Sequence, residues 1–555
     1  MNVSGRMWEP IEISFESACN YQDPFNETEM DMMVYDQEGN EWRIPCFWAG
    51  GKLWKARFSA PHTGIYNYET ICLNAEDTGL NGCTGTICVS KYDGDNPLYI
   101  HGPIEIMEDQ RHFMYHDKTP FLWLGDTWWP LECSRLSENG EVQRLAKDRA
   151  EKGFNLVHVV NGFWCDVKPY DKRLSNEAGF AWTEDYGTIN PEYFNIADKK
   201  IQAVADAGLV IAMAATWGFY IYFMGIEKMK KHMRYTIARY GAYSTIWLTA
   251  GEAAMEFYDF KPQFGFKDIE KSKAIIEEQR RDWTEILKYL KETDPFHRLT
   301  TIHPTFARIS MDDVLDADLL DFTIFQGGRH DGDYKAAYEH LSELTKRGLE
   351  LSPKRPVLNS ETCYEGMLYK CGPEMQRWLF WHSVLDGCAG WTYGANGIFN
   401  MSHDDDPFGV AYYGIDWGQV NWQEAIDFKG AQHVGACKKY LEKYEWWNFV
   451  PAAELMDNAT EKEAHEASVA SRIGDDLIMA YMRRNIRRSD PSHNPHCVRF
   501  KELTPGTCYQ ITAYNPIKDY EVDLGKKAVE ENGRLVTSAL PVLHDWVIVL
   551  KKEVC

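Results

Sequence analysis

Two glutamates, Glu252 and Glu361, stand where a pair of carboxylates could do acid–base chemistry. Each follows a short apolar run, in the segments IWLTAGE (246–252) and PVLNSE (356–361). Hydrolysis of a glycosidic bond needs two such groups, one to protonate the departing oxygen and one to attack or to activate water. The alternative for either residue is a glutamate in a surface loop. We predict that the two form the catalytic pair of a carbohydrate-cleaving enzyme.

Two further glutamates lie close to this pair along the chain. Glu256 and Glu365 each follow a candidate by four residues, and we interpret both as surface residues. The separation of the two working carboxyl groups would decide the stereochemical outcome. About 5–5.5 Å gives a covalent intermediate and retention, whereas roughly 6.5–9.5 Å gives inversion. The sequence alone does not distinguish the two.

Other polar and aromatic residues come where apolar runs end, and such positions carry function in barrel enzymes. Asp126 and Asn161 would bind sugar hydroxyls, although Asp126 could instead cap the next helix. His303 and Gln326 would bind hydroxyls or orient Glu361, and a core role is the alternative for the histidine. The remaining candidates are aromatic and would stack on a sugar ring, pack in the core or, beside Glu361, tune its carboxylate. They are Trp128, Trp129, Trp217, Tyr364, Trp391 and Tyr393.

Helical stretches alternate with short apolar strands from about residue 104 to 445. Strands that are apolar on both faces and separated by helices predict a parallel sheet covered by helices. Asn190-Pro191 would open one helix that Gly208 ends, and Ser137 would open another that Gly153 ends. Eight such strands are the number that a closed (β/α)8 TIM barrel requires. We predict them at 121–125, 156–160, 210–215, 245–249, 299–302, 322–325, 357–359 and 389–390.

The two ends of the chain show short strands instead, with alternating apolar and polar residues. Residues 1–100 contain such runs at 11–15, 29–35, 41–47, 53–59 and 64–72, and similar runs follow residue 446. This spacing predicts a β-sandwich on each side of the barrel. We therefore expect an α/β fold in three domains: an N-terminal sandwich over 1–100, a catalytic barrel over 101–445 and a C-terminal sandwich over 446–555.

The formal net charge of −24 argues against nucleic acid or an anionic membrane as a partner. No apolar run reaches the roughly 18 residues of a membrane span, and the first residues lack an apolar signal core, so we expect a cytoplasmic location. The 14 cysteines are scattered, which favours reduced thiols. We expect no metal and no cofactor, because neither metal-ligand spacing nor a nucleotide-binding motif occurs. The oligomeric state is left open, a homo-oligomer included.

The chain resembles the apiosidase-like glycoside hydrolases, a family of retaining barrel enzymes. The matching segments are FLWLGDTWW (121–129), GFNLV (153–157), IWLTAGE (246–252) and RPVLNSE (355–361). Family members often carry similar flanking sandwiches, the C-terminal one of a collagen-binding type. The resemblance implies that Glu361 is the nucleophile and Glu252 the acid/base. We accordingly expect exo-action on a terminal sugar of a plant-derived glycoside or oligosaccharide, by double displacement.

One position departs from the family pattern. Members often have Gly-Gly-Asp after the fourth strand, where this chain has Ala250-Gly251-Glu252. Many related barrel glycosidases place an asparagine where Gly251 stands, and a glycine cannot bind a 2-hydroxyl. The identity of the sugar and of its linkage is therefore open. The alternatives to a retaining hydrolase are an inverting glycosidase or transglycosidase on the same scaffold, and a non-catalytic barrel that binds glycans.

Overall fold

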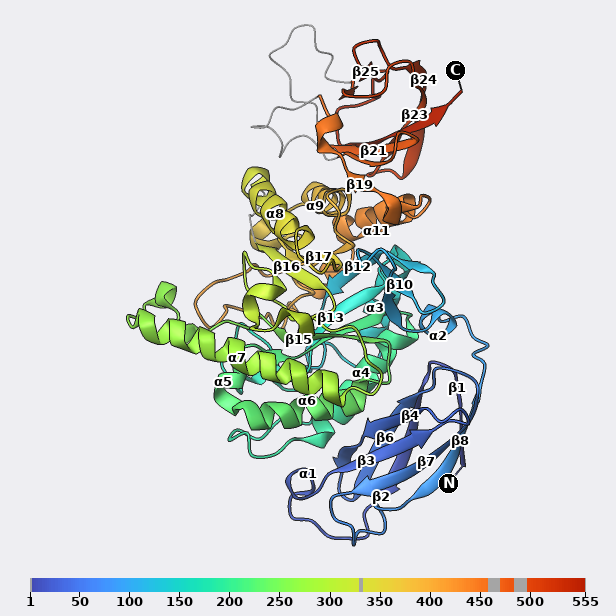
Figure 1. The fold of residues 1–555 in the computed structure, drawn as a ribbon. Helices are drawn as coiled ribbons and strands as arrows, with labels where there is room; N and C mark the ends of the chain where they lie inside the picture. Colours follow the sequence, from blue (N-terminus) through green and yellow to red (C-terminus); the bar gives the residue numbers. More distant parts are fainter. Residues whose placement is uncertain (1, 329–332, 458–469, 484–496, 555) are drawn as a thin grey trace.

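The computed structural model describes residues 2–328, 333–457, 470–483 and 497–554. Its elements form three groups along one long axis (Figure 1). Strands within residues 2–90 lie at one end, a helix-covered parallel sheet lies in the middle, and strands within residues 450–553 lie at the other end. Division of the chain into three domains at residues 100 and 445 stays a proposal.

Two sheets near the N-terminus pack against each other through their apolar faces. One has the order β1 (Asn2–Arg6), β8 (Thr84–Ser90), β7 (Gly64–Cys72), β3 (Met30–Tyr35), β4 (Glu41–Pro45), and the other the order β2 (Pro10–Glu16), β6 (Leu53–Ser59), β5 (Phe47–Gly50). Exposed and buried residues alternate along β7, so one face contributes to a core that includes Trp54, Phe58 and Tyr66. The predicted strands are confirmed, except that 41–47 is divided between β4 and β5.

Seven parallel strands form the curled sheet of a TIM-like barrel. Their order is β15 (Thr245–Gly251), β14 (Val210–Trp217), β13 (Leu156–Val160), β12 (Trp123–Thr127), β18 (Gly390–Thr392), β17 (Val357–Thr362) and β16 (Thr323–Gly328). Nearly every residue in these strands is buried, because helices cover the outer face and side chains fill the inside. The predicted barrel fold is thus confirmed, and seven of the eight predicted strands are present.

The fifth predicted strand, 299–302, is reduced to a single bridge between Thr300 and Trp247. Side-chain hydroxyls occupy backbone carbonyls that a regular ladder would use. The hydroxyl of Thr301 donates to the carbonyl of Phe322 at 2.8 Å, and that of Ser310 lies 2.8 Å from the carbonyl of Ile302. The segment therefore closes the gap between β15 and β16 without forming a strand of its own.

Helices cover the sheet and mostly end where glycines predict. α4 (Pro191–Asp206) starts at the proline after Asn190 and ends before Gly208. α3 (Glu141–Lys152) ends at Gly153, whose φ is +98°, but it starts after Gly140 rather than at Ser137, because the backbone N–H of Ser137 donates to the Glu141 side chain in a preceding turn. The others are α5 (Tyr220–Met224), α6 (Ile226–Tyr240), α7 (Ile269–Thr293), α8 (Tyr334–Leu349), α9 (Pro373–Leu385), α10 (Trp422–Ala425) and α11 (Lys429–Leu441); α1 (Pro24–Glu27) and α2 (Pro97–His101) precede the barrel.

A small antiparallel sheet closes the amino end of the barrel. It consists of β9 (Ile104–Ile106), β10 (Phe113–Tyr115) and β11 (Pro120–Phe121). The ring of Phe113 lies 5.3 Å from that of Phe322 and 5.7 Å from that of Trp123. Trp123 begins β12 and Phe322 precedes β16, so this end is filled with aromatic side chains. A binding site is left to the opposite, carboxyl end of the strands.

A six-stranded antiparallel sheet follows the barrel. Its order is β19 (Val450–Pro451), β20 (Ala470–Ile473), β21 (Leu477–Met482), β26 (Trp546–Glu553), β23 (Cys508–Asn515) and β24 (Tyr520–Ala528). A separate two-stranded sheet consists of β22 (Arg499–Phe500) and β25 (Leu535–Val536). A buried ion pair joins this part to α9. Arg377 donates to both carboxylate oxygens of Asp545 at 2.6 and 2.8 Å. Such a two-point contact fixes orientation as well as distance.

Twelve cysteines among the described residues form no disulfide, whereas Cys508 is disulfide-bonded. The expectation of reduced thiols therefore holds for the twelve and is wrong for Cys508. This residue begins β23 and pairs in register with Glu553 of β26. Strand pairing, which sequence spacing does not reveal, decides which cysteines can meet.

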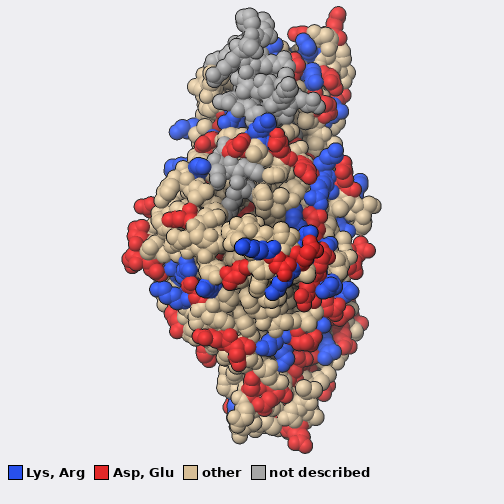
Figure 2. All heavy atoms as spheres, turned by 90° about the vertical axis from the view of Figure 1, so that its left-hand side faces the viewer, with Lys and Arg blue, Asp and Glu red and all other residues tan. Residues whose placement is uncertain are grey.

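Acidic and basic side chains are interspersed over the face shown in Figure 2, rather than separated into two fields. Of the helices that the structure describes, none combines the length and the apolar character needed to cross a bilayer.

Candidate active site

The two predicted catalytic glutamates line the same cavity, at the carboxyl end of the barrel. Its volume is about 340 Å³. Glu252 follows β15 directly, and Glu361 lies within β17. Trp129, Trp217 and Gln326, which were also predicted as substrate contacts, line the cavity with them. Five of the twelve predicted site residues therefore share one space.

Glu252 sits at a tight turn that several hydrogen bonds hold in place. Its φ is +40°, in the left-handed region that non-glycine residues avoid. On either side of it, Gly218 donates its N–H to the carbonyl of Gly251 at 2.6 Å, and Ala253 donates to that of His303 at 3.0 Å. The carboxylate accepts the indole N–H of Trp217 at 3.2 Å. The carboxyl group is therefore placed by its neighbours on two other segments.

Gly251 precedes Glu252 because no larger residue fits there. A Cβ at this position would lie 2.4 Å from Cε3 of Trp217, far inside van der Waals contact. The indole crosses directly over Gly251, which brings its N–H to the carboxylate of Glu252. The glycine that stands where many related barrel glycosidases have an asparagine thus has a packing cause.

Glu361 is almost fully enclosed, with 3% of its surface exposed. Its neighbour His303 has Nε2 3.6 Å from the carboxylate and Nδ1 3.1 Å from the carbonyl of Pro304. A carbonyl only accepts, so Nδ1 carries the proton and the Nε2 lone pair faces Glu361. Burial lowers the pKa of His303 to about 4. At neutral pH the histidine is therefore an uncharged neighbour of Glu361, and it stands beside the cavity rather than in its lining.

Gln326 and two tryptophans complete the part of the site that the sequence predicted. Gln326 pairs in register with Glu361 across β16 and β17, and its buried side-chain oxygen has no hydrogen-bond partner among the described residues. A buried acceptor of this kind is suited to a ligand hydroxyl. Trp129 meets Trp217 edge-on, with ring centroids 5.4 Å apart. Both rings therefore offer carbon-rich surface to the cavity.

Asp126 and Trp128 are fully buried and do not reach the cavity. Arg149 donates to Asp126 at 2.6 Å, and the indole of Trp128 donates to the same oxygen at 2.9 Å. A buried guanidinium needs such a counter-charge. The carboxylate of Asp126 therefore balances Arg149 and lies outside the cavity lining, and its role as a hydroxyl ligand stays a prediction.

Asn161 also lies away from the cavity and is fully buried. Its side-chain amide contacts the hydroxyl of Thr236. When the amide oxygen and nitrogen exchange places, the oxygen accepts from this hydroxyl and the nitrogen donates to the carboxyl group of Glu132. Burial raises the pKa of Glu132 to about 8, so this acid is largely protonated at neutral pH and needs no cation. Asn161 thus satisfies a buried polar cluster instead of a sugar.

The three remaining aromatic candidates are core residues. The hydroxyl of Tyr364 accepts the indole N–H of Trp129 at 3.3 Å, so Tyr364 supports a cavity residue without lining the cavity. Trp391 packs against Tyr393, with ring centroids 6.1 Å apart, and both are fully buried. Trp391 and Tyr393, which were predicted as platforms under a sugar ring, lie outside the cavity lining, and the tuning of Glu361 by Tyr364 stays a prediction.

Glu256 and Glu365, interpreted from sequence as surface residues, are both buried. Glu256 accepts the hydroxyl of Ser272 in α7 at 3.0 Å. Glu365 accepts the hydroxyl of Tyr393 at 2.6 Å and the N–H of Gly430 at 2.9 Å, and burial raises its pKa. The loops that carry them fold back under α7 and α11, which the sequence did not indicate. Neither residue lines the cavity.

Of the twelve cavity residues that the sequence did not single out, four form one cluster and lie on loops without periodicity. Asp166 comes six residues after β13, Tyr258 lies in a short 3-10 helix after β15, and Tyr413 and Trp417 lie in the long segment after β18. Asp166 accepts hydrogen bonds from all three aromatic residues. The available signal was the density of aromatic residues in NGFWCD (161–166), directly after a predicted strand, and in YYGIDW (412–417), in the long segment after the last one.

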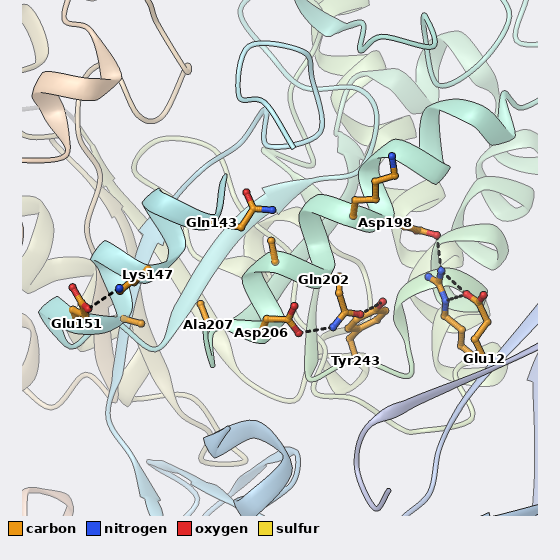
Figure 3. A pocket seen from close by; sticks show the side chains of 13 residues that line it. Glu12, Gln143, Lys147, Glu151, Asp198, Gln202, Asp206, Ala207 and Tyr243 are labelled. Carbon is orange, nitrogen blue, oxygen red and sulfur yellow. Dashed lines mark hydrogen bonds and ion pairs between the residues drawn. The ribbon is translucent and has the colours of Figure 1, made fainter. Parts of the chain in front are cut away.

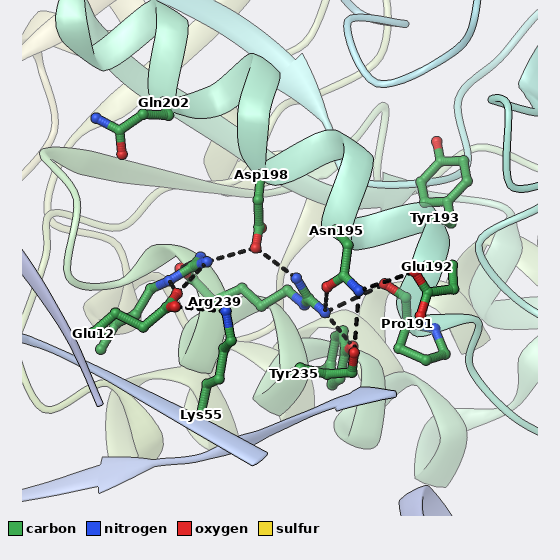
Figure 4. A network of polar contacts seen from close by, with 12 residues as sticks. Glu12, Lys55, Pro191, Glu192, Tyr193, Asn195, Asp198, Gln202, Tyr235 and Arg239 are labelled. Atoms are coloured by element: carbon green, nitrogen blue, oxygen red, sulfur yellow. Dashed lines mark hydrogen bonds and ion pairs between the residues drawn. The ribbon is translucent and has the colours of Figure 1, made fainter. Parts of the chain in front are cut away.

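A larger cavity of about 710 Å³ lies elsewhere and holds none of the predicted residues. It is lined by α3, α4 and the first sandwich (Figure 3). Asp198 at its edge accepts from Arg57 at 2.5 Å and from Arg239 at 2.7 Å (Figure 4). These charged groups bond to one another and join the first sandwich to α4 and α6. We therefore interpret this cavity as part of a structural interface. Over the described residues, no cluster of three or more potential metal ligands occurs.

The sequence matches the family model described as "Apiosidase-like, catalytic domain" over residues 107–448, and a domain of unknown function (DUF5060) over residues 4–72. A search of curated proteins found no match.

A solved glycoside hydrolase has a TM-score of 0.65 and 21% identity, over 83% of this chain and 98% of its own. A glycoside hydrolase family 5 structure from Bacteroides vulgatus has a TM-score of 0.65 and 19% identity, over 83% and 95%. Another structure from Bacteroides vulgatus has a TM-score of 0.67 and 16% identity, over 100% of both chains. At these identities the likeness concerns the fold.

Proposed function

This chain belongs to the apiosidase-like family and is a glycoside hydrolase, and we propose that it removes a terminal sugar from a plant-derived glycoside or oligosaccharide with retention of configuration. The single observation that carries this proposal is the convergence of Glu252 and Glu361 on one cavity. Two carboxyl groups over one sugar are what glycoside hydrolysis requires.

The reaction would proceed in two displacements. In the first, a carboxylate oxygen of Glu361 bonds to the anomeric carbon while the glycosidic C–O bond breaks, and Glu252 gives its proton to the departing oxygen. In the second, Glu252 takes a proton from water as the water oxygen bonds to the anomeric carbon and the ester to Glu361 breaks. Both carboxyl groups then return to their starting states. The hydrogen bond from Trp217 would hold Glu252 toward the bond being cleaved.

The size of the cavity supports action at a chain end. About 340 Å³ lies near the lower limit of small-molecule sites, which span about 300–1,000 Å³. Phe264 and Phe306 line the cavity and are 41% and 51% exposed, so they stand at its mouth. One sugar would be enclosed between the glutamates, and the remainder of the substrate would lie against these rings.

The test begins with a panel of aryl glycosides that includes a β-apioside. We expect turnover of at least one member, and proton NMR of the first-formed sugar should show the anomer of the substrate. First appearance of the opposite anomer would replace the proposal with an inverting mechanism. Saturable binding without turnover by any panel member would favour a non-catalytic, glycan-binding barrel.

Glu252→Gln and Glu361→Gln should each lower turnover at least 10³-fold, because each removes an obligatory group. Glu256→Gln and Glu365→Gln are matched controls, four residues further along and outside the cavity, and should change turnover by less than about threefold wherever thermal unfolding shows a native fold. A dinitrophenyl leaving group needs no protonation, so it should restore the first step in Glu252→Gln but not in Glu361→Gln. Near-normal rates in both glutamine variants would contradict the assignment.

We also propose that nucleic acid and membranes are not partners, on the net charge of −24. A cytoplasmic location is proposed because twelve of the described cysteines form no disulfide, whereas the disulfide at Cys508 favours an oxidising compartment. Cell fractionation tests the cytoplasmic location: the protein should be recovered in the same fraction as a cytoplasmic marker enzyme.

A further inference from the structure

A third carboxylate, that of Asp166, lines the cavity beside Glu252 and Glu361. It belongs to the loop after β13, only 4% of its surface is exposed, and its φ is +69°. A non-glycine residue in this conformation is strained, and such strain gathers at functional sites. The two-displacement mechanism needs two carboxyl groups and gives this third one no role.

Three loops of the barrel converge on Asp166. Tyr413 donates its hydroxyl to Oδ1 at 2.7 Å, and Trp417 donates its indole N–H to Oδ2 at 3.0 Å. From the loop after β15, the hydroxyl of Tyr258 accepts the backbone N–H of Asp166 at 3.1 Å and lies 3.4 Å from Oδ1. The carboxylate is therefore held in one orientation by groups that are themselves part of the wall.

Asp166 keeps the capacity to accept a further hydrogen bond. A carboxylate has about four lone-pair positions, and the three side-chain donors occupy at most three of them. Sugar hydroxyls are the donors that a bound glycoside would bring into the cavity. A fixed carboxylate that accepts from a hydroxyl discriminates strongly, because a ligand lacking the hydroxyl leaves a buried charge with less compensation.

The charges around the cavity add a second selection. Asp166, Glu252 and Glu361 line it, and the cation among its lining residues is Lys261, whose ammonium lies 5.3 Å from the centre of the Tyr258 ring. A sugar bearing its own carboxylate would bring a further negative charge into this enclosed space. Like charges repel more strongly where water is largely excluded.

We propose that Asp166 is a specificity-determining residue, which accepts a hydrogen bond from a hydroxyl of the enclosed sugar and restricts the cavity to sugars without a carboxylate. The substrate class is therefore glycosides of a neutral terminal sugar. This inference rests on the proposed function, since it concerns the sugar between Glu252 and Glu361. The inference does not specify the chemical nature of the leaving group.

The experiment measures binding in full-length Glu361→Gln protein, so that no turnover is required. The probes are two matched pairs: methyl β-galactoside with methyl β-galacturonide, and methyl β-glucoside with methyl β-glucuronide, together with a methyl β-apioside. Titrations follow the fluorescence of the tryptophans in the cavity wall. We expect at least one neutral probe to bind, and its affinity to exceed that of the paired uronide by at least 100-fold.

Asp166→Asn in this background removes the charge at nearly constant volume. We expect it to weaken the neutral probe at least 10-fold and to reduce its advantage over the uronide below 10-fold. Asp259→Asn is the matched control, because Asp259 is exposed, bonds to Tyr412 and does not line the cavity. It should leave both affinities unchanged. Tyr413→Phe keeps the carboxylate and removes one of its anchors, and should weaken the neutral probe about threefold or more.

Three outcomes would overturn the inference: no neutral probe binds, the uronide binds as tightly as its neutral partner, or a folded Asp166→Asn protein keeps the affinities of its parent. If Asp166→Asn does not fold, the comparison of neutral and anionic probes in the parent, with Tyr413→Phe, still decides. Binding of neutral probes together with a lack of turnover in the wild type would contradict the proposed function and leave the role of Asp166 intact.

Discussion

The backbone N–H of Ala254, which lies two residues after Glu252, donates to a carboxylate oxygen of Asp313 at 3.1 Å. Glu252 has a φ of +40°, and a non-glycine residue in this region costs about 1–3 kcal/mol unless its surroundings hold it. Asp313 is fully buried at the end of a short 3-10 helix, with Nε of Arg308 3.0 Å from its other oxygen. Asp313 is therefore a positioning residue for Glu252.

We expect Asp313→Ala to lower kcat by about 10–100-fold with little change in KM. The reason is that a hydrogen bond to a charged group is worth about 1.5–3 kcal/mol, and its loss would let the strained turn relax away from the substrate. Asp313→Asn keeps an acceptor oxygen for Ala254 and should retain most of the activity. Steady-state kinetics on the substrate found in the glycoside panel measures both variants. A rise in KM at constant kcat would speak for a different role.

His232 should link the stability of the fold to pH. Its Nε2 lies 2.8 Å from the carbonyl of Ala215, and its Nδ1 accepts the indole N–H of Trp182 at 3.1 Å. Since a carbonyl only accepts, Nε2 carries the proton and the ring is neutral. A second proton would have to enter at Nδ1, against the N–H of Trp182. Burial accordingly lowers the pKa of His232 to about 4.

The sign of the effect follows from the two pKa values. In the unfolded chain a histidine titrates near pH 6.5, so as the pH falls the unfolded state binds the proton first. The contribution of His232 to stability is complete above pH 6.5 and is lost between about pH 6.5 and 4, to a limit of about 3 kcal/mol. Denaturant unfolding at pH 7, 6 and 5 measures it. His232→Gln should remove its share of this dependence and leave that of other buried histidines such as His303, whereas His116→Gln, at a half-exposed histidine, should leave the dependence unchanged.

Most of the barrel could be predicted because its strands are buried on both faces and its helices end at glycines. Local sequence carries both signals. The segment 299–302 shows where that reasoning stops, since the hydroxyls of Thr301 and Ser310 take carbonyls that a ladder would use. An apolar run shows that a segment is buried, but not which groups will satisfy its backbone.

The site could be predicted where strand ends alone fix a residue, as for Glu252, Glu361 and Gln326. The sequence does not show where another element supplies a strong partner, and Asp126 is the clearest case, because its carboxylate pairs with Arg149 of the following helix. Asp166 was missed as well. Its position depends on Tyr258, Tyr413 and Trp417, which lie on loops far apart in the sequence.

Gly251→Ala tests how closely the backbone beneath Glu252 is matched to Trp217. The added methyl group would lie 2.4 Å from the indole, so the ring must move, and overpacking of this kind costs about 1–3 kcal/mol. The hydrogen bond from the indole N–H to Glu252 would then be lost. Such a bond contributes about 0.5–1.5 kcal/mol, so its loss should lower kcat roughly threefold to tenfold.

Trp217→Phe should lower kcat by a similar factor, since it removes the same N–H without crowding the backbone. The double variant is the decisive measurement. The smaller phenyl ring gives the alanine room, and the hydrogen bond can be lost only once, so the two effects on kcat should not multiply. Independent, multiplying losses would mean that Gly251 acts on Glu252 by a route other than the indole that lies across it.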